Sequence, residues 1–348
     1  MNDIVKNEVT AVRLLFVNEQ GTVNLVVAED VGRIKFVEVL KGNFFGGFNH
    51  NVIPLYEERL VGAATISVCV PSTSPGYESK YCSNACLVAF GATNQVVLCS
   101  MRPIKELLCI KPSKYNRKRS IPYMDWGYGL TPTIREQTMP LLAIAWDRMI
   151  QLVYINENTN EIQMDGYYCC EEEINQVYFM ADSILLVLCN SKEIKILYTT
   201  KFQPGDYKYL DVESAKDDLI QSVFKEAVAV TKHSELWHGM DFSDIRRGVI
   251  AVNNNKQQFS NFNNTITKFQ KSVIFAGSKV LTKARLLSWR EYIEKLKFSD
   301  NYDWLTVLKA ALEIYNGELK GFAMLPDEKE RREMYLKDYM KKLIMTSI

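Results

Sequence analysis

The sequence predicts a mainly β protein in which a β-propeller of about five to seven blades, complete or incomplete, precedes the first helices of an α-solenoid. Two observations carry this prediction. Similar β-hairpins recur along most of the chain, and near Thr282 the spacing of apolar residues changes to a helical period. We therefore expect a propeller at residues 1–281 and the first helices of a truncated α-solenoid at residues 282–348.

The hairpins share one design, in which β-branched or aliphatic runs flank a short polar turn. Four strong copies and a weaker fifth are Val23–Val39, Ala85–Cys99, Leu141–Ile155, Ser183–Tyr198 and Ser272–Ala284. The turns recur at intervals of about 40 to 60 residues, with a gap of roughly twice that before the last, which fits a four-stranded blade with its loops. A β-sandwich or two stacked barrels also fit the hairpins, so these favour a propeller only modestly. The repeating Trp-Asp and Gly-His signatures of WD40 proteins are absent.

After Lys279, three series of apolar residues fall at helical spacing. They are Leu286, Trp289, Ile293 and Leu296; Trp304, Leu308, Ala311 and Tyr315; and Leu336, Tyr339 and Leu343. We expect Asp300 with Asp303 to cap the second helix and Asn316-Gly317 to end it. Asp327 and Glu330 predict a start like a capping box for the third helix. Since solenoid helices bury their faces on neighbouring repeats, we expect the stack to continue beyond Ile348.

Composition and charge indicate a cytosolic protein. The chain has 348 residues, of which 47% are hydrophobic, and its 42 basic residues almost balance 41 acidic ones, so no global field favours nucleic acid or an anionic membrane. The first residues lack the apolar region of a secretory signal, and no apolar run is long enough to span a bilayer. The eight cysteines lie between Cys69 and Cys189, mostly in strand-like runs, as expected of reduced, buried thiols.

One local basic stretch is a candidate contact for a membrane or an acidic partner. Its residues are Lys111, Lys114, Arg117, Lys118 and Arg119, with no acidic residue among them. Cations near an anionic surface contribute on the order of 1 kcal/mol each. The same residues suit a nuclear-import string or nucleic acid, and a solvated loop between blades is the most common role of such a stretch.

Trp126 and Tyr128 are candidate aromatic anchors for a partner, although packing between blades is the more frequent role of such residues. Metal and catalytic sites have little support. Cys82 and Cys86 lack a second ligand pair nearby, and in Cys169-Cys170 alternation along a strand predicts one buried and one exposed thiol. We predict no cofactor, no metal ion and no catalytic residue.

Four strings resemble the family of vacuolar protein sorting-associated protein eight, a subunit of the CORVET endosomal tether. The first two are Ile121-Pro-Tyr-Met-Asp-Trp-Gly-Tyr-Gly129 and Pro140-Leu-Leu-Ala-Ile-Ala-Trp-Asp-Arg-Met-Ile-Gln-Leu152, where Asp147 replaces the family's usual glycine. The third is Ala284-Arg-Leu-Leu-Ser-Trp-Arg-Glu-Tyr-Ile-Glu-Lys-Leu296. The fourth is Ile314-Tyr-Asn-Gly317, followed by Leu325-Pro-Asp-Glu-Lys-Glu-Arg-Arg332. They occur in the family's order and cover about residues 120–348.

The resemblance implies a non-enzymatic scaffold that is recruited to the cytosolic face of endosomes. Its partners would be a Rab GTPase of early endosomes and other tethering-complex subunits, and it would promote endosome fusion and protein transport to the vacuole or lysosome. Rab binding is implied by the resemblance alone. The alternatives are another propeller–solenoid scaffold (a HOPS subunit, a vesicle coat or a nuclear-pore component) and a nucleic-acid-associated propeller that uses residues 111–119. A propeller enzyme would need convergent acids or histidines at one face of the central channel.

Overall fold

The structure is a computed structural model, and its description covers most of the predicted propeller and nearly all of the helical region. The described residues are 9–17, 22–29, 33–40, 49–56, 65–69, 87–93, 95–101, 104–112, 121–134, 136–156, 161–189, 194–204, 228–233, 240–241, 251–252, 266–269, 272–276, 281–298, 303–319, 322, 324–326 and 328–347.

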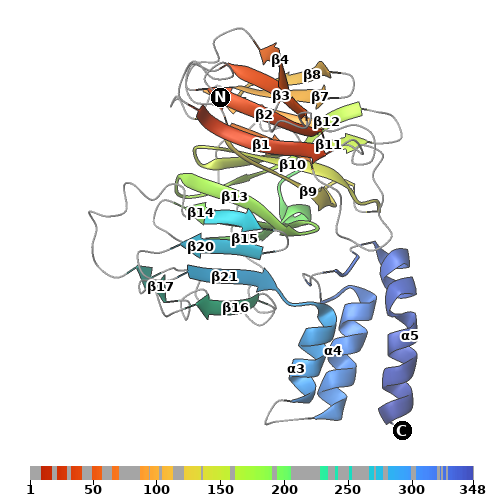
Figure 1. The fold of residues 1–348 in the computed structure, drawn as a ribbon. Helices are drawn as coiled ribbons and strands as arrows, with labels where there is room; N and C mark the ends of the chain where they lie inside the picture. The colour runs from red at the N-terminus through yellow and green to blue at the C-terminus, as the bar shows by residue number, and fades with distance from the viewer. Residues whose placement is uncertain are drawn as a thin grey trace.

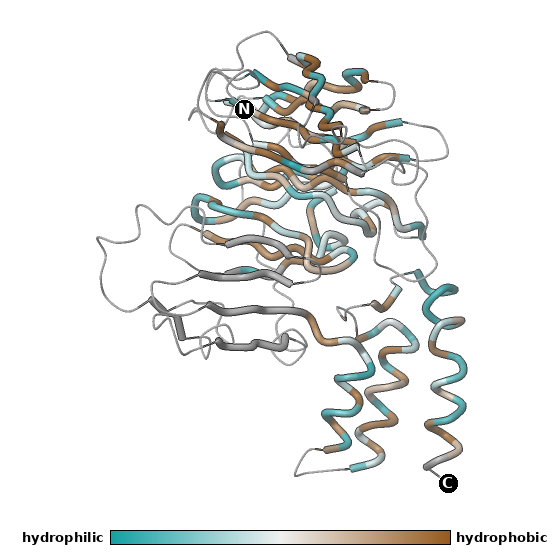
Figure 2. Tube along the Cα trace, in the orientation of Figure 1, coloured by the Kyte–Doolittle hydropathy of each residue, from teal (hydrophilic) through white to brown (hydrophobic). Residues whose placement is uncertain are grey.

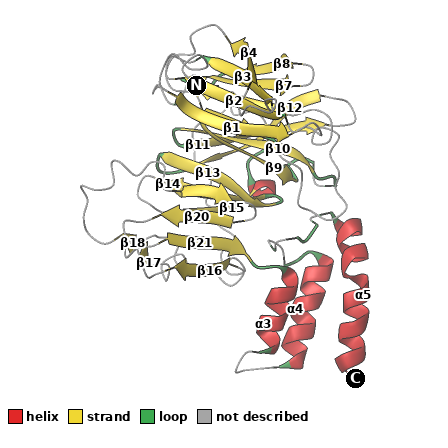
Figure 3. Cartoon of the chain, viewed as in Figure 1, coloured by secondary structure: helices red, strands yellow, loops and turns green. Residues whose placement is uncertain are grey.

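Antiparallel sheets of consecutive strands follow one another along the chain (Figures 1 and 3). The first contains β1 (Val9–Val17), β2 (Val23–Glu29), β3 (Ile34–Leu40) and β4 (Asn49–Tyr56). The second contains β5 (Thr65–Val68), β6 (Leu87–Ala92), β7 (Gln95–Met101) and β8 (Ile104–Ile110). The third contains β9 (Tyr123–Gly129), β10 (Met139–Trp146), β11 (Met149–Asn156) and β12 (Glu161–Cys169). In all three, each strand pairs with the next in the sequence.

The next sheet has three described strands, β13 (Ile174–Ala181), β14 (Ile184–Cys189) and β15 (Ile194–Tyr198), which the short helix η1 (Thr199–Lys201) follows. The last four-stranded sheet has the order β16-β21-β20-β19, with β16 (Val228–His233), β19 (Ile266–Phe269), β20 (Ser272–Ala276) and β21 (Leu281–Leu286). A pair of short strands, β17 (Met240–Asp241) and β18 (Ala251–Val252), completes the described β-structure.

The sheets are arranged as propeller blades. The first strand of each blade packs beside the first strand of the next, so that β1 lies by β5, β5 by β9, and β9 by β13. Apolar layers fill the spaces between blades one and two, two and three, and three and four. Figure 2 shows hydrophobic residues concentrated along these strands. A mainly β fold with propeller blades, as predicted, is therefore confirmed.

The expected hairpins form, with one refinement at the end of the sheet region. The pairs β2–β3, β6–β7, β10–β11, β14–β15 and β20–β21 are all antiparallel hairpins. In the β10–β11 turn, Asp147 has a φ of 51°, a conformation that favours glycine, the residue that the family pattern places there. Thr282 lies inside β21, and Leu286 is the buried last residue of that strand rather than the first residue of a helical face.

Three helices follow β21 and have a core of their own. α3 spans Trp289–Lys297, α4 spans Trp304–Asn316 and α5 spans Lys329–Ser347. Ser288 begins α3 in a capping box with Glu291, and Asp303 caps α4 as predicted. Gly317 ends α4 with a φ of 76°, also as predicted. Asp300 and Asp327 lie outside the described residues.

Candidate functional site

The predicted basic contact lies mostly outside the described residues. Lys111, which directly follows β8, is exposed. Lys114, Arg117, Lys118 and Arg119 are not among the described residues. The proposed contact of this stretch with a membrane or an acidic partner therefore stays a prediction.

Trp126 and Tyr128 lie in the apolar layer between blades two and three. Their side chains are 1% and 4% exposed. The indole Nε1–H of Trp126 donates a hydrogen bond of 3.2 Å to the carbonyl oxygen of Ser67 on β5, and the Tyr128 hydroxyl lies 3.6 Å from the Cys69 sulfur. Both aromatics therefore join two blades, and neither ring presents a surface to a partner in this structure.

The two blade strings of the family resemblance lie side by side. Strand β9 pairs with β10, so that Gly127 is opposite Leu141 and Trp126 is opposite Leu142. A Cβ atom added to Gly127 would lie 2.2 Å from Cγ of Phe179 on β13. Asp125 accepts a hydrogen bond of 2.8 Å from the Phe179 N–H. One face of β9 thus packs against the fourth blade, which explains why a glycine and an acid stand in this string.

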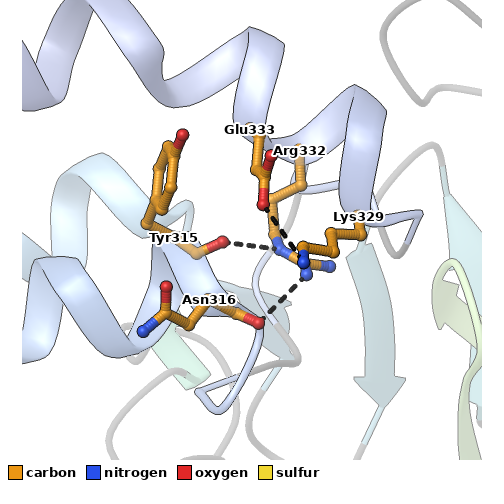
Figure 4. Close-up of polar contacts among 5 residues, drawn as sticks. All are labelled: Tyr315, Asn316, Lys329, Arg332 and Glu333. Carbon is orange, nitrogen blue, oxygen red and sulfur yellow. Dashed lines mark hydrogen bonds and ion pairs between the residues drawn. The ribbon is translucent and has the colours of Figure 1, made fainter.

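The two halves of the helical string meet at a buried arginine (Figure 4). Arg332 on α5 is 4% exposed, and its guanidinium donates to the carbonyl oxygens of Tyr315 at 3.2 Å and Asn316 at 3.3 Å. It also lies 3.5 Å from the carbonyl oxygen of Pro326. The carbonyls at the end of a helix lack partners within the helix and carry partial negative charge. Arg332 satisfies the carbonyls of Tyr315 and Asn316 and thereby holds α5 against the last turn of α4.

Gly317 makes room for this arginine. A Cβ atom at Gly317 would lie 2.2 Å from Nη2 of Arg332. Beside the site, Lys329 and Glu333 form an ion pair of 3.8 Å on the surface of α5 (Figure 4). The sequence analysis identified Gly317 as a helix stop but missed Arg332, because nothing in the local pattern distinguishes it from its neighbour Arg331.

Glu328 connects the helices to the propeller. Its carboxylate accepts a hydrogen bond from the backbone N–H of Thr138, at the start of the third blade's second strand. The other carboxylate oxygen lies 2.8 Å from Nε of Arg331. Thr138 and Glu328, 190 residues apart in sequence, thus form a polar contact between the propeller and the helical region. We call the contact among Thr138, Glu328 and Arg331 the propeller–helix junction.

The thiols and histidines form no metal centre among the described residues. No group of three or more His, Cys, Asp or Glu side chains in that part of the chain is arranged to hold a metal ion. Cys169 is half-buried and Cys170 is buried. A hydrogen bond with Cys189 and then burial raise the pKa of Cys170 above its ordinary value. Burial, reinforced by Glu106, raises the pKa of Cys99 to about 12. Such thiols stay protonated at neutral pH.

The three histidines and the pair Cys82 and Cys86 are only partly described by the structure. His50 is exposed on β4, and His233 lies on β16. Cys82, Cys86 and His238 lie outside the described residues. No helix in the described part of the chain is long and apolar enough to cross a membrane.

A comparison with family models agrees with the two blade strings found in the sequence. The family model described as Vps8 beta-propeller matches residues 53–242, more than half of the chain. Among solved structures, the β-propeller domain of Cps50 (Swd1) from Myceliophteria thermophila is similar at 12% sequence identity, with a TM-score of 0.38. That match covers 58% of this chain and 60% of the other, so the aligned region spans about three fifths of that domain. No curated protein matches the chain.

Proposed function

Because the chain belongs to the Vps8 β-propeller family, we propose that it is a non-enzymatic scaffold subunit of an endosomal vesicle-tethering complex of the CORVET kind. In this role it binds a Rab GTPase of early endosomes and neighbouring subunits, and it promotes endosome fusion and transport to the vacuole or lysosome. It acts in the cytoplasm, peripherally on endosomal membranes. The family match over residues 53–242 is the observation that carries the proposal.

The arrangement of the blades supports a binding role. Continuous apolar layers between the first four blades make a stiff body, since packed interiors transmit strain rather than yielding to it. A stiff body holds its surface loops in fixed relative positions, which reduces the entropy lost when a partner binds. The propeller is thus suited to present contacts to a Rab or to a neighbouring subunit.

The helices support an extended scaffold. We propose that α3, α4 and α5 are the first helices of an α-solenoid. On α4, Leu305 and Leu312 are 72% and 52% exposed and lie two turns apart on one face, with Leu308 and Tyr315 half-buried beside them. Such a stripe is typical of a helix face that packs against a further helix.

Nucleotide-dependent Rab binding tests the proposal. The purified chain is expected to bind an early-endosomal Rab loaded with a non-hydrolysable GTP analogue at least about fivefold more tightly than the GDP form, the lower end of typical coupling. Isothermal titration calorimetry measures both affinities, with a late-endosomal Rab as the control. Equal or absent binding across a panel of Rab proteins would contradict the Rab assignment.

We propose membrane contact through the basic stretch as a separate property of the scaffold. The chain is expected to co-sediment with phosphoinositide-containing vesicles more than with neutral ones, and to lose this difference when Lys111, Lys114, Arg117, Lys118 and Arg119 are replaced by glutamine. Binding to RNA with a steep dependence on salt, and none to vesicles, would instead favour a nucleic-acid-associated propeller.

A further inference from the structure

The connection between β9 and β10 carries an exposed threonine. Its described residues, 130–134 and 136–138, are called the β9–β10 loop here. Among the residues whose side chains the structure describes, two serines or threonines are exposed, Thr133 and Thr306. Thr306 lies in the first turn of α4 and is followed three residues later by a lysine. Thr133 lies outside helices and strands, and the exposed Glu136 follows three residues later. A hydroxyl with a carboxylate at this spacing, on a surface loop, suits an acid-directed protein kinase.

A buried carboxylate holds the β9–β10 loop against β12. The Thr133 hydroxyl donates a hydrogen bond to Oδ2 of Asp165, and the Thr133 backbone N–H donates to the same oxygen at 3.3 Å. The Thr131 hydroxyl also donates to this oxygen, at 2.5 Å. Asp165 is only 6% exposed. Beside it, a Cβ atom added to Gly166 would lie 2.7 Å from Cγ of Pro132, so the loop packs closely on the strand. The position of the loop therefore depends on donors to one buried negative charge.

The two ends of the β9–β10 loop contact different parts of the molecule. At its start, the Leu130 N–H donates to the Ser183 hydroxyl at 2.8 Å, and the Thr199 hydroxyl donates to the Leu130 carbonyl oxygen at 2.6 Å. Ser183 and Thr199 belong to the region of blade four and are fully buried. At its end, the Thr138 N–H donates to Glu328 in the propeller–helix junction. The loop therefore connects blade four to the contact that the helices make.

We propose that Thr133 is a phosphorylation site for an acid-directed protein kinase, and that its modification loosens the propeller–helix junction. In this reaction the Thr133 oxygen forms a bond to the γ-phosphorus of ATP, and the bond from that phosphorus to the β-phosphate oxygen breaks. ADP leaves, and a base of the kinase takes the hydroxyl proton. The product carries about two negative charges at neutral pH and no longer donates through Oγ. Beside the buried Asp165 the like charges repel strongly, so the loop moves away from β12.

The phosphate acts on the helices through the end of the loop. Blade four holds the start of the loop at Leu130, so a shift at Thr133 is passed toward Thr138. Because the Thr138 N–H is the donor to Glu328, this shift weakens the contact between α5 and the third blade. A local change of charge then alters the arrangement of two larger bodies. This switch depends on the contacts of the loop alone and not on the proposed Rab contact or endosomal role.

Phosphate transfer to the folded chain tests the site. The full chain is incubated with ATP and either an acid-directed or a proline-directed kinase, and mass spectrometry locates the phosphate. The acid-directed kinase is expected to modify Thr133 at least about tenfold faster in the wild-type chain than in Glu136→Lys. Glu136 is exposed, so the folding of this variant is expected to persist. No phosphate on Thr133, or equal rates in the two chains, would overturn the site. Modification of the buried Thr131 by the proline-directed kinase alone would also overturn it.

The effect on the junction is measured on the phosphorylated chain and on Thr133→Glu. Hydrogen exchange at residues 136–138 is expected to accelerate at least about tenfold, and pulsed electron paramagnetic resonance should give a broader distance distribution between labels on the third blade and α5. Thr133→Val removes the hydroxyl without adding charge and should have a smaller effect. Thr306→Glu is the matched control, because the Thr306 hydroxyl also donates to an aspartate, Asp303, and it should leave the loop unchanged. Equal effects of Thr133→Glu and Thr133→Val, or no effect of the phosphate, would overturn the switch.

Discussion

The contacts between blades and the contact between the propeller and its helices are built from different chemistry. Between blades three and four, a continuous apolar layer contains Leu152, Phe179 and Leu185, and the hydrogen bond from Phe179 to Asp125 lies at its rim. At the propeller–helix junction, the described contact is polar. The helices bury their own apolar residues against one another.

The two kinds of contact therefore have different roles: the apolar layers make the blades stiff, and the polar junction affects the orientation of the helices relative to the propeller. Apolar layers scale in strength with buried area and hold blades together over their whole length. A small polar interface holds two bodies in register but permits rearrangement, as at many interdomain contacts. We therefore expect the blades to behave as one unit and the helices to change their angle to it more easily. The scaffold role proposed above would use both properties.

Gly127→Ala is expected to have the largest effect, because it attacks the layer between blades. The new methyl group collides with the Phe179 ring, and overpacking of this kind costs about 2 to 3 kcal/mol of unfolding free energy. Urea denaturation followed by tryptophan fluorescence measures the change. Adding Phe179→Leu to the same chain should recover part of the loss, and an unaltered denaturation midpoint for Gly127→Ala would contradict the packing described here.

Arg332→Lys tests the helical side of the comparison. A lysine ammonium cannot reproduce the fork that bonds to the carbonyls of Tyr315 and Asn316, so we expect a loss of about 2 kcal/mol. The loss should be confined to the helices and visible as faster hydrogen exchange in α4 and α5, with exchange in the blades unchanged. The matched control is Arg331→Lys, whose more exposed ion pair with Glu328 predicts a change within about 0.5 kcal/mol.

Glu328→Ala tests the junction itself. It removes the acceptor of the Thr138 N–H, which lies in a buried residue, at an expected cost of about 1 to 2 kcal/mol. Spin labels on the third blade and on α5 should show a broader distance distribution by pulsed electron paramagnetic resonance. Glu330→Ala is the control, because Glu330 lies two residues away in the sequence and is exposed. Identical distributions in both variants would mean that the Glu328 contact does not set the angle of the helices.

Asp303→Asn is expected to have the smallest effect, and one that depends on pH. Hydrogen bonds from Thr306 and Leu305 lower the pKa of the Asp303 carboxyl below its ordinary value. A pKa that is lower in the folded state means that the cap stabilises α4 above the ordinary pKa and loses that contribution as the pH falls through the folded pKa. Asparagine caps helices about as well and does not titrate.

The readout for Asp303 is the exchange rate of the Thr306 amide during acid titration. In the wild-type chain this rate should rise as the pH falls through the lowered pKa of the Asp303 carboxyl, whereas in Asp303→Asn it should follow only the intrinsic chemistry of exchange. The same acid dependence in both chains would assign the transition to another group.

Local patterns were sufficient for five hairpins, three helices and several of their ends. Hairpins depend on alternation and turn residues that lie within a few positions of one another, which is why β10 and β11 could be predicted from Leu141–Ile155. Caps are equally local, as Asp303 and Gly317 illustrate. The exact change from strand to helix was misplaced, because Leu286 satisfies both the strand and the helical pattern and its pairing with β16 places it in the strand.

The sequence by itself determined that repeated hairpins give way to helices, where α4 starts and stops, and the motifs that assign the family. Tertiary structure alone decided which chemically similar residues are buried, paired or exposed. It placed Trp126 between blades, gave Arg332 rather than Arg331 the end of α4, joined Glu328 to Thr138, and tied Thr133 to Asp165. The physical reason is distance along the chain. Propensities and caps act within a turn, whereas burial and pairing depend on which remote segments the packed blades bring together.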